Sequence, residues 1–369
     1  MHPLNQTTQP ATASAGLSCD LQALLQLDPR SLRVLGKPST CSIAAAFYQK
    51  KIDCNDPCRS APLGAYLCAE SAKRTPAFVF EQLFVRRLQS DHQVSQNWYV
   101  CQAANPKEKS VWFKLLSQRG EWSETDDIFA RSLTAQGISV WRSWFSDRSL
   151  YLSGFGCNQT TLTAQEFFRQ NPSRMDLKSG RVRSMLGAGQ PPKKAMEYLS
   201  ALDRQAANDL IRSRIFINCF LELTGGRPFD IDAVCRRDGQ LFVAEFKRKY
   251  PAANGSFGVD KHLTWLADVL ARTAPLYHFI LEDLAGAGGK HRDPTTALTD
   301  QSVEGPHFRW LGVHLGPGFQ AKFSSSLRTS GLDSGQKGGN RKQIAIPKRL
   351  FTVLQNGHAQ IESSKLPTV

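Results

Sequence analysis

A mixed α/β fold is predicted for the C-terminal half of this 369-residue chain, and three features of the sequence predict it. Two short β-prone runs, at 229–235 and 241–246, are joined through Asp238-Gly239, a pair of residues that favours a tight hairpin turn. A helix-periodic stretch follows at 260–272, and a continuous apolar run follows at 276–281. Because a helical crossover between strands of one sheet leads to a parallel strand, the sheet is expected to combine antiparallel and parallel pairs.

Changes in composition divide the chain into four parts. Residues 1–18 are polar and are expected to form a flexible leader, whereas 322–369 are expected to form a basic, largely flexible tail. A Gly/Pro cluster at 187–192 separates two domains. We expect an N-terminal α+β domain of unassigned fold at 19–186 and the α/β domain at 187–321.

The N-terminal domain is expected to be helical first and strand-rich later. Apolar spacing is helical from about residue 20 to about residue 90, whereas 94–157 is β-prone and holds five of the seven tryptophans. Such an aromatic, basic segment could stack on single-stranded bases. A β-rich core with buried aromatic side chains explains the same pattern and is favoured.

The nine cysteines are scattered along a chain without a secretion signal, which favours reduced thiols in the cytoplasm. Cys54 and Cys58, flanked by Cys41 and Cys68, are a candidate zinc set. The outer two stand alone rather than in a second close pair, so ordinary thiols are favoured. No apolar run approaches the roughly 18 to 20 residues that a membrane helix needs, and no membrane partner is expected.

The charge balance favours a polyanionic partner. Lys and Arg number 46 against 32 Asp and Glu, which gives a formal net charge of +14. A basic protein of this kind attracts the phosphate backbone of nucleic acids.

The predicted hairpin brings charged residues together on one face. A two-residue turn at Asp238-Gly239 places Asp232 opposite Glu245 and Asp230 opposite Lys247. Two carboxylates directly opposite each other on a sheet repel one another. A divalent cation between them removes this repulsion, and Mg²⁺ binds one or two carboxylates together with water and substrate phosphate.

Lys247 lies two residues after Glu245 on the same strand face. There it could orient an attacking water or neutralise charge that develops on a phosphate. Asp232, Glu245 and Lys247 are therefore candidate catalytic residues for metal-assisted phosphodiester hydrolysis.

Asp232, twelve intervening residues and then Glu245-Phe246-Lys247 resemble the motif of the PD-(D/E)XK, or restriction-endonuclease-like, nuclease superfamily. The amino-acid sequence of the hairpin looks most like that of the Holliday-junction-resolvase-like and related small-nuclease branches of this superfamily. The proline of the motif is displaced, since Phe229 separates Pro228 from Asp230.

The resemblance covers about residues 194–283 and implies a mixed-sheet core of a helix, three strands, a crossover helix and a strand. The first helix is expected at 194–214 and the first strand at 215–223. The crossover helix is expected to start at an Asp260 cap. Its inward residues are expected to be Leu263, Leu266, Ala267 and Leu270.

The resemblance also implies a metal cofactor and further site residues. Mg²⁺, with Mn²⁺ as a substitute, would be held by Asp232 and Glu245. The family often adds an acidic residue from its first helix, and Glu197 is the best-placed candidate, ahead of Asp209 and Glu222.

Each remaining candidate has a plainer interpretation. Asp230 is a candidate site residue, or an exposed ion-pair partner of Lys247. His262 could contact phosphate at a helix N-terminus, although a lone histidine there is more often a bystander. The basic run 247–249 could be a solvated strand end, and Cys235 is expected to pack in the core.

Two functions of different class follow. The first is a divalent-metal-dependent nuclease, with DNA favoured over RNA as substrate and endonuclease action favoured; a homodimer would let one site per chain cut both strands. The second is a non-catalytic nucleic-acid-binding or scaffold protein that retains the fold. An intact Asp/Glu/Lys trio favours the first.

Overall fold

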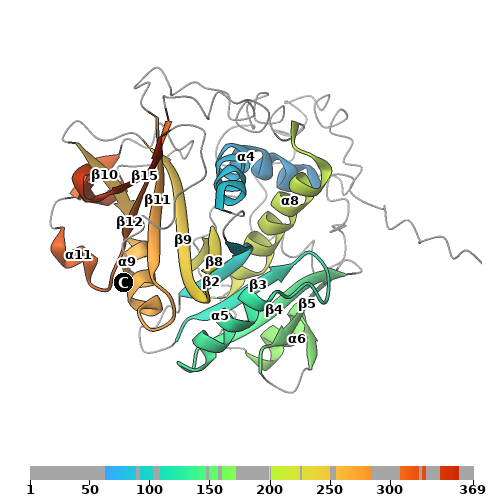
Figure 1. Cartoon of the computed structure of the whole chain (residues 1–369). Helices are drawn as coiled ribbons and strands as arrows, with labels where there is room; N and C mark the ends of the chain where they lie inside the picture. The colour runs from blue at the N-terminus through green and yellow to red at the C-terminus, as the bar shows by residue number, and fades with distance from the viewer. Residues whose placement is uncertain are drawn as a thin grey trace, which may run out of the picture.

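The predicted mixed α/β architecture is confirmed: helices surround three sheets (Figure 1). The computed structural model describes residues 63–88, 92–102, 109–146, 149–156, 160–171, 199, 201–224, 227–249, 255–283, 308–323, 326–329 and 341–356.

One six-stranded sheet contains the predicted hairpin, and we call it the hairpin sheet. Its order is β1-β8-β9-β11-β12-β15, in which only β9 and β11 pair in parallel. The strands are β1 (Gln93–Ser95), β8 (Ala233–Arg237), β9 (Gln240–Lys249), β11 (Leu276–Asp283), β12 (Phe308–His314) and β15 (Thr352–Asn356). The parallel pair is the one that the apolar run at 276–281 predicts.

A second six-stranded sheet, the N-terminal sheet, has the order β6-β5-β4-β3-β2-β7, with β3 and β4 parallel. Its strands are β2 (Trp98–Gln102), β3 (Val111–Leu116), β4 (Ser139–Ser146), β5 (Ser149–Gly154), β6 (Thr161–Thr163) and β7 (Arg227–Ile231). A small antiparallel sheet contains β10 (Ser256–Asp260), β13 (Ser326–Thr329) and β14 (Arg341–Pro347).

The helices pack on the faces of these sheets. The α-helices are α4 (Leu63–Leu88), α5 (Glu124–Thr134), α6 (Ala164–Gln170), α8 (Arg204–Cys219), α9 (His262–Leu270) and α11 (Phe319–Lys322). Short 3₁₀ turns form η3 (Leu221–Leu223) and η6 (Lys348–Leu350). Helices α4 and α8 lie side by side, and α4 also packs on β9 (Figure 1). Within the part of the chain that the structure describes, no helix is long and apolar enough to cross a membrane.

The two large sheets exchange strands across the predicted domain boundary. Strand β1 pairs with β8 in the hairpin sheet, and β7 pairs with β2 in the N-terminal sheet. The boundary predicted between 186 and 187 falls within 172–198, outside the described residues. The exchange means that the segment before 187 contributes directly to the sheet that carries the hairpin.

The hairpin forms with the predicted turn and register. Asp238 and Gly239 have φ angles of 49° and 80°, the positive values that a type I′ turn requires. Arg237 pairs with Gln240, and the register continues to Ala233 opposite Ala244.

The turn predicts a backbone effect at Gly239. A β-carbon built there meets nothing within 4 Å, so only the positive φ opposes a side chain. We expect Gly239→Val to lower the free energy of unfolding by about 1 to 2 kcal/mol, measured by urea denaturation. Gly239→Asn, which tolerates positive φ, serves as the control and should cost clearly less. Equal losses in the two variants would contradict this backbone explanation.

The aromatic side chains of the N-terminal sheet form its core, as predicted. Trp98 and Trp112 are fully buried with Phe129 of α5, and Tyr99 and Phe113 are buried on the opposite face. In the hairpin sheet, Cys235 is fully buried, which confirms its predicted packing role. The inward face of α9 is also confirmed, since all four predicted residues are buried: Leu263, Leu266, Ala267 and Leu270.

Three local predictions are wrong. Residues 215–219 continue α8 instead of starting a strand, because Ile211, Ile215 and Phe216 bury one helical face in the N-terminal core. Asp260 does not cap α9; it ends β10 and accepts a hydrogen bond of 2.7 Å from Gln343 Nε2.

The third wrong prediction concerns the part of the expected flexible tail, 322–369, that the structure describes at 341–356. Residues 341–356 contain β14 and β15, and Ile344, Ile346 and Leu354 are buried. These apolar residues complete the cores beneath the small sheet and the hairpin sheet, which fixes the segment in place.

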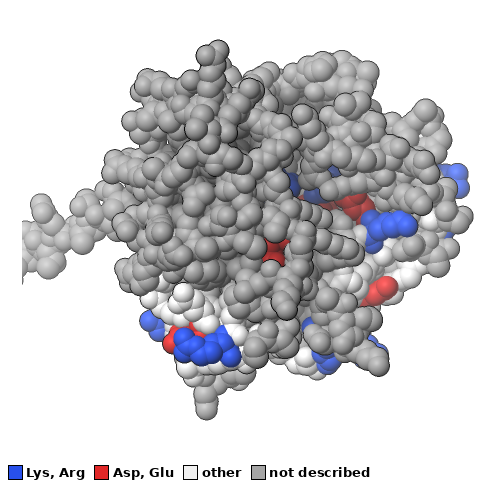
Figure 2. All heavy atoms as spheres, turned by 180° about the vertical axis from the view of Figure 1, so that it is seen from behind, with Lys and Arg blue, Asp and Glu red and all other residues white. Residues whose placement is uncertain are grey.

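The net positive charge does not gather in one place on the face shown in Figure 2. The described Lys and Arg side chains form separate small groups there, with Asp and Glu among them. On that face, the described residues therefore form no continuous basic patch.

Candidate active site

The structure brings together the three residues of the predicted motif. Lys247 Nζ lies 2.8 Å from Glu245 Oε1 and 3.5 Å from Asp232 Oδ2. The side chains of Asp232 and Glu245 are 5% and 6% exposed, whereas that of Lys247 is 35% exposed. The carboxylates therefore lie inside the protein, and the ammonium group borders the solvent.

A break in the predicted strand 229–235 positions Asp232. The chain bends there, so that β7 belongs to the N-terminal sheet and β8 to the hairpin sheet. In the hairpin, hydrogen-bonded pairs alternate from the turn outward, and the Phe246 N–H faces the place that Ile231 would fill in a continuous strand. Asp232 Oδ2 accepts this N–H at 2.5 Å instead. The carboxylate replaces the lost backbone partner and is held in place by it.

Burial controls the ionisation of the two carboxyl groups. Burial, and then the charge of Glu245, raise the pKa of Asp232 to about 8. Burial raises the pKa of Glu245 to about 7, although Lys247 acts in the opposite direction. Burial alone would lower the pKa of Lys247, but the charges of Asp232 and Glu245 outweigh it and raise that pKa well above its usual value. Lys247 therefore keeps its proton at neutral pH.

Glu81 is a carboxyl group that the sequence analysis does not predict near this site, and it interacts electrostatically with Asp232 and Glu245. It lies on α4, three residues before Phe84, whose ring stacks on Phe246 with centroids 5.1 Å apart. Burial, and then the charge of Asp232, raise the pKa of Glu81 to about 8. The sequence feature that could have indicated Glu81 is a single carboxylate within the largely apolar stretch 78–88, one helical turn from residues that are buried.

Asp230 lies near the site but not where it is predicted. Strand β7 places it opposite Tyr99 of β2, so the predicted cross-strand pairing with Lys247 is wrong. Its carboxylate is 61% exposed and lies 3.7 Å from the Arg214 guanidinium. Loss of solvent around its carboxylate would raise the pKa of Asp230, but the positive charges of Arg214 and Lys247 outweigh that effect, and the pKa of Asp230 is lowered. Asp230 thus borders the site as an ionised group.

The other candidates have different surroundings. Glu197 lies outside the described residues, as do Cys41, Cys54, Cys58 and the side chain of Cys68. Asp209 accepts hydrogen bonds of 3.0 Å from Gln205 on α8, and Glu222 lies in η3. His262 begins α9, and its ring stacks on Phe229 at 4.7 Å.

The donor set fits Mg²⁺ as a site of two carboxylates. Within the described ranges, no group of three or more His, Cys, Asp and Glu side chains is arranged to hold a metal ion. Mg²⁺ does not require such a group, because it keeps several waters and takes substrate phosphate as a ligand. Asp232 and Glu245 are the residues that would hold it.

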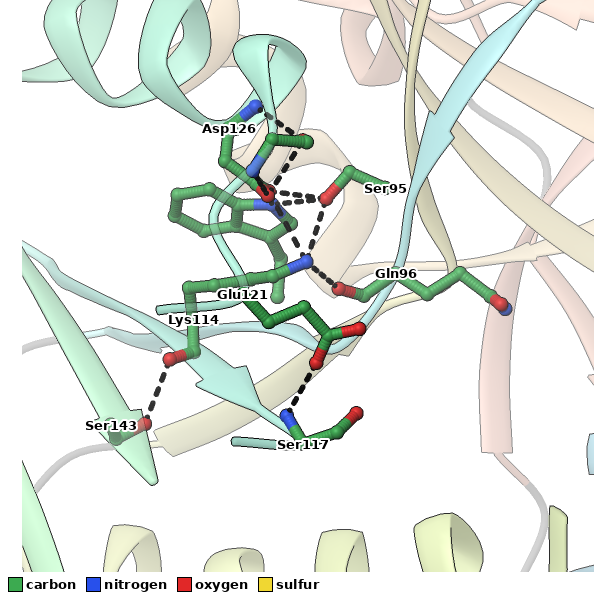
Figure 3. A network of polar contacts seen from close by, with 9 residues as sticks. Ser95, Gln96, Lys114, Ser117, Glu121, Asp126 and Ser143 are labelled. Atoms are coloured by element: carbon green, nitrogen blue, oxygen red, sulfur yellow. Dashed lines mark hydrogen bonds and ion pairs between the residues drawn. The ribbon is translucent and has the colours of Figure 1, made fainter. Parts of the chain in front are cut away.

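A second buried polar cluster has a structural role (Figure 3). Lys114 Nζ on β3 lies 3.2 Å from Asp126 Oδ1 on α5 and 2.8 Å from Ser95 Oγ on β1. Trp98 Nε1 donates to Asp126 Oδ1 at 2.9 Å. Burial lowers the pKa of Lys114, although the charge of Asp126 acts in the opposite direction. The cluster joins β1 of the hairpin sheet to the N-terminal sheet.

Comparison of the chain with protein-family models, with curated proteins and with solved structures finds no match. The chemistry of Asp232, Glu245 and Lys247 is therefore the basis for a functional proposal.

Proposed function

We propose that this protein is a divalent-metal-dependent nuclease that hydrolyses phosphodiester bonds, with DNA as the favoured substrate. The observation that carries the proposal is the buried Asp232 and Glu245 pair with Lys247 Nζ within 3.5 Å of each. When both carboxyl groups are ionised, they and the single ammonium leave an excess negative charge, which a bound proton compensates at neutral pH and a metal cation can compensate in its place. A metal ion and a bound phosphate satisfy all three groups together.

Each residue has a separate role in this proposal. Asp232 and Glu245 hold the metal, which supplies Lewis acidity at a phosphoryl oxygen when bound. Lys247 keeps its Nζ proton and places positive charge beside the phosphate, where negative charge develops during hydrolysis. The Phe246 N–H fixes the orientation of Asp232.

The topology supports a restriction-endonuclease-like core. The β8–β9 hairpin carries the site, and α9 then leads to β11, which lies parallel to β9. Helix α4 packs on β9 and contributes Glu81. In this proposal, the helix that contributes an acidic residue comes from the segment before 187 rather than from 194–214.

The alternative is a non-catalytic nucleic-acid-binding or scaffold protein. One observation favours it: Lys247 already forms an ion pair with both carboxylates, so their charges are partly compensated by the chain itself.

Cleavage of labelled DNA and RNA separates the two functions. We expect the full chain to cut at least one of duplex, branched or single-stranded DNA, or RNA, in Mg²⁺ or Mn²⁺ and not in EDTA. Glu245→Ala should lower the rate by at least about 10³-fold, whereas Glu124→Ala, a change at a carboxylate that is 64% exposed, should not change it. Binding without cleavage in every metal would contradict the nuclease and leave the alternative.

A further inference from the structure

Arg214 lies beside the candidate site with unused hydrogen-bonding capacity. Its side chain on α8 is 11% exposed, and its closest charged partner, Asp230, is 3.7 Å away. That distance is longer than a hydrogen bond. Arg214 Nε is buried and has no hydrogen-bond partner among the described residues. A buried guanidinium donor without an acceptor costs free energy, so this group is arranged for an acceptor that the described chain does not supply.

A second arginine adds positive charge at the same place. Arg74 lies on α4, which packs against α8 (Figure 1). Its charge lowers the pKa of Arg214, after the larger effect of burial, and also lowers the pKa of Asp230. One exposed carboxylate does not compensate two guanidinium groups. A phosphate does, because its oxygens accept the paired N–H groups of arginine.

The arginines lie to one side of the carboxylates. Arg74 and Glu81 are seven residues apart on α4, which places them on the same helical face about 10 Å apart along the axis. This spacing favours two separate phosphates, one at the arginines and another at Asp232 and Glu245.

We propose that Arg214 and Arg74 bind a backbone phosphate that flanks the scissile phosphate, so that the site takes a polynucleotide strand rather than an isolated phosphate ester. This inference rests on the proposed nuclease function and extends it. Arg214 is a substrate-binding residue in this proposal, and Asp230 holds its guanidinium in position.

Salt-dependent binding tests the proposal with the full chain. The probe is fluorescently labelled DNA of about 20 nucleotides, single-stranded and duplex, in EDTA between about 50 and about 200 mM salt. We expect Arg214→Gln to weaken binding about tenfold and to reduce the slope of log affinity against log salt by about 0.7 to 0.9, the value for one lost phosphate contact. Arg214→Lys should keep the slope and lose part of the affinity, because lysine retains the positive charge but lacks the planar guanidinium group with its paired N–H donors.

A matched control lies on the same helix. Arg212 Nε is likewise buried without a hydrogen-bond partner among the described residues, but Arg212 Nη1 donates to the Ser117 carbonyl at 3.4 Å. Arg212→Gln should leave both affinity and slope unchanged, which separates the position of Arg214 beside the site from the effect of an unpaired Nε. Exposed Arg74 provides a variant, Arg74→Gln, that should reduce the slope without affecting folding. In cleavage assays, Arg214→Gln should raise KM about tenfold and change kcat by less than about threefold.

The outcomes separate this inference from the function on which it rests. If the wild-type protein binds and cuts DNA but both arginine variants keep its salt slope, the phosphate subsite is wrong and the nuclease stands. If the wild-type protein neither binds nor cuts any polynucleotide, the nuclease and the subsite are both wrong. Cleavage of an isolated phosphodiester such as bis(p-nitrophenyl) phosphate as efficiently as DNA would also overturn the subsite.

Discussion

Asp232→Asn is expected to stabilise the protein in EDTA at pH 8.5 by about 2 kcal/mol and to abolish metal-dependent cleavage. The amide keeps the acceptor for the Phe246 N–H but removes one of the two buried negative charges. Glu245 and Lys247, 2.8 Å apart, then form a balanced pair. Urea denaturation at several pH values measures the stability.

The pH dependence has a definite sign. Burial raises the pKa of Asp232 to about 8 in the folded protein, against about 3.9 in an unfolded chain. A raised pKa means that the folded state favours the protonated carboxyl group. Its stabilising contribution is complete below about pH 4 and is lost as the pH rises through about 8. The advantage of Asp232→Asn should therefore be small at pH 4 and grow up to pH 8.5.

Asp230→Asn provides the control, because the charges of Arg214 and Lys247 lower the pKa of Asp230. Removing this exposed, favourably paired carboxylate should give no gain in stability above pH 4. A gain of similar size in both variants would mean that general charge reduction, rather than burial at Asp232, is responsible. A loss of stability in Asp232→Asn at pH 8.5 would contradict the prediction directly.

Local patterns in the sequence predict the part of the site that lies within one hairpin. Asp238 and Gly239 specify the turn, the turn specifies the register, and the register brings Asp232 toward Glu245. The spacing of apolar residues likewise predicts the buried face of α9 and the parallel strand β11. Each of these depends on residues close together in the chain, where periodicity and turn chemistry act.

The rest of the site depends on contacts between distant segments. Strand β7 pairs with β2 of the N-terminal sheet, and this separates Asp230 from the hairpin. Nothing in the local sequence at 227–231 specifies β2 as the partner of β7. Glu81 lies on α4, more than 140 residues before the hairpin, and α4 packs on β9 through the stacked rings of Phe84 and Phe246. At 215–219, residues with strand propensity are helical because Ile215 and Phe216 pack into the N-terminal core. Tertiary packing overrides local preference at these positions.

The cluster that joins the two large sheets should be the most sensitive structural position outside the site. We expect Asp126→Ala to lower the free energy of unfolding by about 3 to 5 kcal/mol, because it leaves the buried Lys114 ammonium without its anion. Lys114→Met should cost less, since Asp126 keeps hydrogen bonds from Ser95, Trp98 and Ser123. Urea denaturation followed by tryptophan fluorescence measures both losses.

An exposed ion pair on the same helix isolates the effect of burial. Arg131 Nε lies 2.7 Å from Asp127 Oδ2, and the side chains of Arg131 and Asp127 are 73% and 30% exposed. Because solvent screens such a pair, Asp127→Ala should change the free energy of unfolding by less than about 0.5 kcal/mol. In the double variant Lys114→Met with Asp126→Ala, neither charge is left unpaired, so its loss should be smaller than the sum of the single losses. Strict additivity would show that Lys114 and Asp126 act separately, and that the junction between the sheets depends on their packing rather than on their charges.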